Sequence, residues 1–189
     1  MKAGILCLQG AFSEHGKMLN SLGISTVELR KASDLNQQFD GLVIPGGEST
    51  VMIKLLTELD MLERLKQLIL SGLPTFGTCA GLILLAKNIT NDFRARLATM
   101  DIEAKRNAYG RQLGSFSAEV DFKGAGKFPA VFIRAPYIAD VYGETKVLAE
   151  FDGKIVAARE NNQLATAFHP ELTKDTRIHE YFIDMMKNA

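Results

Sequence analysis

FGTCAGLILLA, residues 76–86, joins a short apolar strand to an apolar helix through a glycine-flanked turn. Its centre, Gly77-Thr78-Cys79-Ala80-Gly81, has the form of a nucleophile elbow, in which glycines let neighbouring backbone approach a strained central residue. A sulfur there faces the N-terminus of the following helix, whose dipole favours the thiolate. The backbone N–H of Ala80 would donate to an oxyanion. The structural alternative is a small buried cysteine between two helix-packing glycines.

Apolar runs and helical patterns alternate on both sides of this turn. Before it we expect strands over 3–8, 26–29 and 41–44, helices over 50–56 and 61–70, and a helix with one apolar side from Phe12 to Leu22. After it we expect a helix from Ala80, no clear period over 88–100, and strands over 101–104, 115–122, 131–133, 146–151, 155–158 and 164–168. The closing helix carries apolar residues at helical spacing: Ile178, Tyr181, Phe182, Met185 and Met186. The pattern predicts one α/β domain over residues 1–189, with a mixed, mainly parallel sheet and helices on both faces.

Composition narrows the class of protein. The 189 residues are 47% hydrophobic and 23% charged, which excludes a disordered chain and a coiled coil. Lys plus Arg and Asp plus Glu balance at 22 each without a basic cluster, so nucleic acid is not an expected partner. No apolar run reaches the roughly 18 residues of a membrane span. Two cysteines fit a reducing compartment, and we expect a cytoplasmic protein without a metal or cofactor, with Cys7 in the core of the first strand.

A cysteine nucleophile needs a base, and the chain has three histidines. His15 and His179 lie in predicted helices and are interpreted as surface or packing residues. His169 follows an apolar strand directly, at a strand end where α/β proteins place their sites. In extended chain Glu171 would project to the same side and bond the imidazole, and Pro170 restricts His169 to that geometry. Taken alone, the tripeptide is more typical of a loop than of a catalytic pair.

Together the two motifs predict acyl transfer from an amide or ester. Cys79 would attack and form a thioester, His169 would carry the proton, and Glu171 would orient the ring. PGGEST, residues 45–50, follows a strand and precedes a helix, so its free backbone N–H groups suit a second oxyanion donor at Gly47. It is neither a dinucleotide fingerprint nor a phosphate loop, and its structural alternative is a tight turn.

FGTCAGLILLA, PGGEST and FHPEL at 168–172 resemble the class I, triad-type glutamine amidotransferases. LQGAFSEH at 8–15, RNAYGRQLGSF at 106–116 and VFIRAP at 131–136 narrow the resemblance to the glutaminase subunits of pyridoxal 5'-phosphate synthases. The resemblance implies a flavodoxin-like α/β fold with Cys79, His169 and Glu171 as the triad. It also implies hydrolysis of L-glutamine to glutamate and ammonia, which a separate (β/α)8-barrel synthase subunit would use to build the cofactor.

The same resemblance assigns further residues. Glutamine-binding positions fall on Gly47, Glu48, Ser49, Arg106, Ile133 and Arg134; a guanidinium suits a carboxylate, and Glu48 could pair with an ammonium. Free glutaminases of this kind are poorly active, and docking of the synthase completes an oxyanion hole near Gly46 and Gly47 with Gln9 involved. The chain departs from the usual pattern within 88–105, NITNDFRARLATMDIEAK, where Lys105 stands in place of a common acidic residue.

Two other functions stay open from the residues. One is an α/β cysteine hydrolase of the dienelactone or deglycase-like kind, although α/β-hydrolases run nucleophile, acid, His and this chain runs Cys, His, Glu. The other is a non-catalytic regulatory protein that keeps an inactive elbow. An intact triad argues against it, because a binding module has no need of all three groups.

Overall fold

The computed structural model describes residues 1–92, 94, 96–106 and 114–189. Its first half holds β1 (Lys2–Leu6), α1 (Phe12–Ser21), β2 (Ser25–Leu29), η1 (Ala32–Asn36), β3 (Gly41–Ile44), α2 (Ser49–Glu58), α3 (Leu62–Leu70), β4 (Thr75–Thr78), α4 (Ala80–Leu85) and β5 (Ala86–Ile89). Its second half holds β6 (Met100–Lys105), β7 (Ser115–Phe122), β8 (Gly126–Ile133), β9 (Tyr137–Val141), β10 (Lys146–Phe151), β11 (Lys154–Glu160), β12 (Gln163–Thr166), η2 (Pro170–Leu172) and α5 (Arg177–Lys187).

Five parallel strands form one half of the main sheet, in the order β2-β1-β3-β4-β12. This is the flavodoxin-like order, in which the chain reverses direction across the sheet between β1 and β3. Thr78 is paired with Thr166, so β4 and β12 end at the same edge. The sheet continues through antiparallel β11, β9 and β6, while β7 and β8 form a separate hairpin. The predicted mixed, mainly parallel sheet is confirmed in this arrangement.

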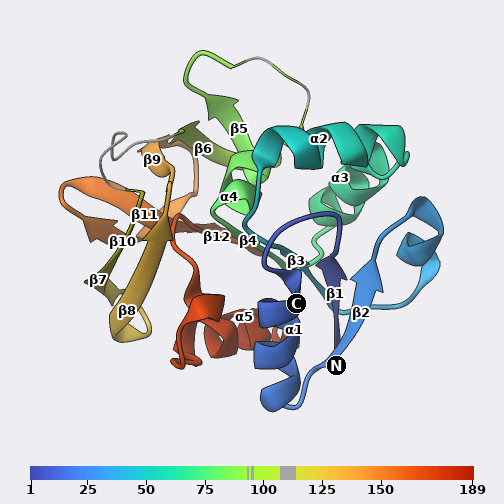
Figure 1. Ribbon diagram of the computed structural model, residues 1–189, viewed down its shortest axis with the longest axis horizontal. Coiled ribbons are helices and arrows are strands. Elements are labelled where there is room, and N and C mark those ends of the chain that lie inside the picture. Colours follow the sequence, from blue (N-terminus) through green and yellow to red (C-terminus); the bar gives the residue numbers. More distant parts are fainter. Residues whose placement is uncertain (93, 95, 107–113) are drawn as a thin grey trace.

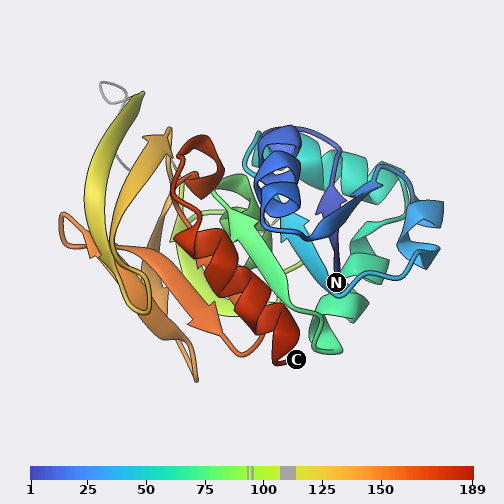
Figure 2. The same cartoon turned by 90° about the horizontal axis from the view of Figure 1, so that it is seen from below.

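Helices cover both faces of the parallel half. Figure 1 shows α2, α3 and α4 on one side of the sheet and α1 with α5 on the other, and Figure 2 brings α1 and α5 to the front. Phe76 on β4 is fully buried and packs against Phe182 of α5, with ring centroids 5.6 Å apart. The apolar stripe of α5 is buried as expected, apart from the half-buried Tyr181. Among the described residues, none of the helices is long and apolar enough to cross a membrane.

The structure corrects several element boundaries. The first strand ends at Leu6, and Cys7 lies just beyond it but is buried as predicted. The apolar helix from Ala80 has only six residues and passes directly into β5, whose exposed Lys87 and Asn88 carry no apolar alternation. Strand β9 was not predicted either, because Ala139 and Asp140 at its centre are both exposed and break the alternation, and its place in the sheet depends on pairing with β6 and β11.

Candidate active site

The turn between β4 and α4 has the backbone of a nucleophile elbow. Cys79 has φ 48° and ψ −97°, a conformation that L side chains rarely adopt. A Cβ at Gly81 would lie 2.1 Å from the carbonyl oxygen of Ile44, and one at Gly77 would lie 2.8 Å from the Gly81 carbonyl carbon. Both flanking glycines are therefore needed for the helix to approach β3 and β4 this closely, while Cys79 remains at the edge of a cavity.

His169 and Glu171 stand beside this turn and contact each other. Nδ1 of His169 lies 2.7 Å from Oε1 of Glu171, and the Glu171 side chain is fully buried. The contact that we predicted is present, but the reason given for it was wrong. Pro170–Leu172 forms a 3-10 turn and not extended chain, because proline's fixed φ also suits the first position of such a turn.

Electrostatics favour a charged pair at these two residues. Burial opposes a charge on His169, but hydrogen bonds with Cys79 and Glu171 and the charges of both outweigh it and raise the pKa of His169 to about 10. Burial also opposes ionisation of Glu171, yet His15 and His169 together lower the pKa of Glu171. Glu171 therefore stays a carboxylate, and His169 favours the imidazolium.

Sequence reasoning overlooked His15 as part of this site. It is interpreted above as a surface or packing residue, and it does pack in the interior, but its Nε2 also lies 3.4 Å from Oε2 of Glu171. His15 is fully buried, and its other ring nitrogen contacts His179. The one available signal was its position at the end of LQGAFSEH, a segment that the resemblance had already singled out.

The loop after β3 is held by the loop after β1. The Gly46 carbonyl oxygen accepts a hydrogen bond from Ala11 N at 3.1 Å, and Oε1 of Gln9 accepts one from Glu48 N at 2.5 Å. Since a trans peptide directs its C=O and N–H to opposite sides, the Gly47 N–H points away from Ala11. Gln9 was expected at an oxyanion hole, whereas the structure places its amide oxygen on the backbone of this loop.

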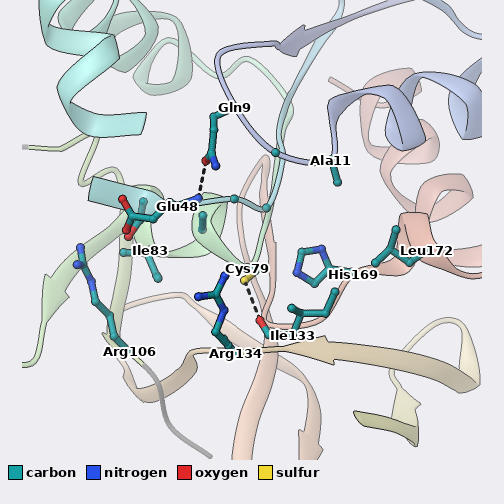
Figure 3. A pocket seen from close by; sticks show the side chains of 15 residues that line it. Gln9, Ala11, Glu48, Cys79, Ile83, Arg106, Ile133, Arg134, His169 and Leu172 are labelled. Atoms are coloured by element: carbon teal, nitrogen blue, oxygen red, sulfur yellow. Dashed lines mark hydrogen bonds between the residues drawn. The ribbon is translucent and has the colours of Figure 1, made fainter. Parts of the chain in front are cut away.

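A cavity of about 430 Å³ brings the predicted residues together. Every residue that we expected at the site except Glu171 lines it: Gln9, Gly47, Glu48, Ser49, Cys79, Ala80, Arg106, Ile133, Arg134 and His169. Glu171 lies behind His169 instead. In Figure 3, Arg134 and His169 flank Cys79, and Arg106 reaches toward the same cavity from another strand end. Cys79 Sγ lies 3.9 Å from the Ile133 carbonyl oxygen.

Charged groups of both signs border the cavity. Arg106 Nη2 lies 3.1 Å from Oδ2 of Asp92, yet its buried Nε and Nη2 make no hydrogen bond to the described residues. Nη2 is ion-paired with Asp92, but Nε is left over, and a buried donor of this kind suits an anionic group of a ligand. Glu48 has a structural role as well, because its carboxylate accepts from Thr50 N and Val51 N and caps α2. Asp92 belongs to the 88–105 segment that departs from the family pattern, so that segment reaches the site.

Part of one motif falls outside this description. Residues 107–113 of RNAYGRQLGSF lie outside the described residues, whereas Arg106 at its start is placed. Within the described part of the chain no group of three or more His, Cys, Asp and Glu could hold a metal ion.

Comparisons with known proteins identify the family of the chain. The proteins named pyridoxal 5'-phosphate synthase subunit PdxT from Streptococcus pneumoniae CGSP14 and Haemophilus influenzae PittEE are 56% and 57% identical to this chain, over 99% and 100% of it and 98% and 100% of their own lengths. A crystal structure of a glutamine amidotransferase superposes with a TM-score of 0.93 at 40% identity, over 98% of both chains. A putative GMP synthase subunit from Thermoplasma acidophilum, 19% identical with a TM-score of 0.71 over 100% of this chain and 94% of its own, shares the fold. The model of the SNO glutamine amidotransferase family matches residues 5–188, and the chain belongs to that family.

Proposed function

We propose that the chain hydrolyses L-glutamine to L-glutamate and ammonia at this cavity and supplies the ammonia to a pyridoxal 5'-phosphate synthase subunit for vitamin B6 synthesis. One observation carries the proposal: Cys79 stands on a strained elbow beside the hydrogen-bonded His169 and Glu171, at the edge where β1, β3, β4 and β12 end. The family and the names of the full-length relatives support the same activity. They favour it over the deglycase-like hydrolase and the non-catalytic regulatory protein.

The proposed reaction proceeds in two steps. The Cys79 thiolate attacks the side-chain amide carbon of glutamine, and the imidazolium of His169 gives its proton to the leaving nitrogen, so that ammonia departs and a thioester remains. His169, now neutral, takes a proton from water, whose oxygen attacks the thioester and releases glutamate and Cys79. Glu171 holds the imidazole by its Nδ1 throughout.

We assign the developing oxyanion to backbone donors. Ala80 N follows the nucleophile at the start of α4, and Gly47 N belongs to the peptide whose carbonyl faces Ala11. Gln9 is proposed to act indirectly, since its amide holds the Glu48 backbone and so the loop that carries Gly47.

The amino-acid end of glutamine is proposed to lie among the charged groups of the cavity. Nε of Arg106, which has no hydrogen-bond partner among the described residues, suits the α-carboxylate, with Arg134 as a second cation, and the Glu48 carboxylate suits the ammonium. Gly47, Ser49 and Ile133 complete the binding surface through their positions in the lining.

The partner is proposed to be a (β/α)8-barrel synthase subunit, and both proteins are proposed to be cytoplasmic. We further propose that docking controls the orientation of the Gly46–Gly47 peptide. The hydrogen bond from Ala11 N to Gly46 O favours one orientation, and two adjacent glycines make the alternative sterically accessible. A partner that contacts the loop after β1 could therefore select between them.

The test is glutamate release from L-glutamine, measured for the chain alone and mixed with a barrel synthase subunit, with Cys79→Ala as the control. The proposal expects release that rises on mixing and disappears in Cys79→Ala. Equal rates of glutamate release with and without the synthase would refute only the proposed control of activity by docking. Release that survives in Cys79→Ala, or none under either condition, would refute the glutaminase assignment of this site.

A further inference from the structure

The other two histidines of the chain lie directly behind Glu171. His15 on α1 and His179 on α5 are both fully buried, and His15 Nδ1 lies 2.9 Å from His179 Nε2. Nε2 of His15 lies 3.4 Å from Glu171 Oε2 and 3.2 Å from the Thr78 hydroxyl. Elements far apart in sequence therefore place all three histidines of the chain in one line of contacts that ends at Cys79.

The buried atoms at the two ends of this line fix the direction of its protons. Within the described residues, His179 Nδ1 has no hydrogen-bond partner, and a bare nitrogen costs less there than an orphaned N–H. The proton of His179 is therefore on Nε2 and is donated to His15 Nδ1. His15 must then carry its own proton on Nε2, on the side of Glu171.

The surroundings of Glu171 also indicate that His15 carries its proton on Nε2. Oε2 of Glu171 is buried and has no hydrogen-bond partner in the described part of the chain, and a carboxylate oxygen can only accept. Nε2 of His15 lies 3.4 Å from this oxygen and 3.2 Å from the Thr78 hydroxyl, so its N–H stands within reach of both. Burial lowers the pKa values of both His15 and His179, the latter to about 3, so both rings are neutral and one can donate to the other.

We propose that His15 is a positioning residue of the triad, which donates from Nε2 to Glu171 Oε2 and is itself held in the required tautomer by His179. The inference rests on the proposed function of Cys79, His169 and Glu171. Its effect is to occupy the second carboxylate oxygen, so that Glu171 stays ionised in an apolar surrounding and keeps Oε1 on His169.

The groups that face His15 belong to three elements. Glu171 comes from η2, His179 from α5, and the uncharged Thr78 and Phe76 from β4. The charges of His169 and of Glu14, its neighbour on α1, also act on the ring. Of these, Glu171 is the only buried carboxylate, so a loss of the His15 donor should be felt there first.

Three substitutions separate positioning from packing. His15→Gln carries an amide N–H near the place of imidazole Nε2, His15→Asn carries one near Nδ1, and His15→Phe keeps the ring without any donor. Steady-state glutaminase kinetics would be measured across pH with the synthase present, alongside thermal unfolding. We expect His15→Asn and His15→Phe to lose about tenfold or more in kcat with KM little changed, and His15→Gln to stay within about fivefold of the wild type.

The pH profile is the readout that a packing role would not change. Without a donor to its charged form the pKa of Glu171 rises, so the acid limb of kcat/KM should move to higher pH by about one unit in His15→Asn and His15→Phe. If His15→Phe does not fold, kcat and the acid limb of kcat/KM in His15→Gln and His15→Asn still test the inference. Equal kcat and equal acid limbs in those two variants would overturn the inference.

Cys79→Ala distinguishes this failure from failure of the proposed function. Activity that persists in Cys79→Ala refutes the triad itself. Loss of activity in Cys79→Ala, combined with a wild-type pH profile in every His15 variant, refutes only the role of His15.

Discussion

Gly10→Ala should damage catalysis without touching the substrate. Gly10 has φ +93°, and a Cβ there would lie 1.7 Å from the carbonyl oxygen of Gly46. Backbone cannot tolerate such a contact, so the Gly46 carbonyl must turn or move away. The movement would break its hydrogen bond with Ala11 N and carry the Gly47 N–H out of place.

The magnitude follows from three effects. An L side chain at positive φ costs ~1–2 kcal/mol of folding free energy, and the lost hydrogen bond costs about 1 kcal/mol more. Loss of one oxyanion donor lowers kcat by about 10²- to 10³-fold. For a chain of this size, the destabilisation corresponds to a melting temperature lower by roughly 5–10 °C.

Gly23→Ala is the matched control. Gly23 has φ +79°, but a Cβ there would meet nothing within 4 Å. It therefore carries the backbone strain alone, and we expect a small loss of stability with unchanged kcat. Both variants would be assayed by glutamate release with the synthase present and by thermal unfolding. A wild-type kcat in Gly10→Ala, or an equal loss in Gly23→Ala, would refute the role given to the Gly46–Gly47 peptide.

Three further predictions concern the charged groups. Burial, and then the charge of Glu28, raise the pKa of Cys7 to about 11. Iodoacetamide at pH 8 should therefore alkylate Cys79 far faster than Cys7, which peptide mass spectrometry can measure. Comparable alkylation rates of the two cysteines would contradict an activated Cys79. Asp92→Asn removes the carboxylate that lies 3.1 Å from Arg106 and holds its guanidinium in place by an ion pair. The substitution should raise KM for glutamine about threefold to tenfold and leave kcat nearly constant. A fall in kcat alone would argue against a binding role of Arg106. The pKa of His169 is raised from 6.5 to about 10 in the folded protein, so its stabilisation is complete below pH ~6.5 and is lost as pH rises toward 10. Melting temperatures should therefore fall over that window more steeply in the wild type than in His169→Gln, and parallel curves would refute the assigned charge.

The parts of the site that could be predicted from sequence are those whose geometry is local. The elbow depends on Gly77 and Gly81 within five residues, and its strained φ at Cys79 follows from that spacing. The contact of His169 with Glu171 was also local, although the 3-10 turn that makes it was not foreseen. Proline before Glu171 is compatible with both an extended chain and a turn, so sequence alone could not choose between them.

Features that depend on the order of strands in the sheet could not be predicted from the sequence. Strand β9 shows no apolar alternation, and only its pairing with β6 and β11 marks it as a strand. Gln9 and Ala11 hold the Gly46–Glu48 loop only because β1 and β3 are adjacent. That adjacency is the reversal point of the flavodoxin-like order, and no spacing in the sequence encodes it.

His15 marks the boundary between these two cases. An imidazole on the inner side of a helix is interpreted as packing, but both ring nitrogens of the buried His15 have polar neighbours: His179 at Nδ1, and Thr78 and Glu171 at Nε2. Helices α1 and α5 cover the same face of the sheet, which brings His15 near the start of the chain to His179 and Glu171 near its end. The buried Oε2 of Glu171 has no hydrogen-bond partner among the described residues. The hydrogen bond that we propose from His15 would satisfy this oxygen, and it gives the buried ring a role beyond packing in the core.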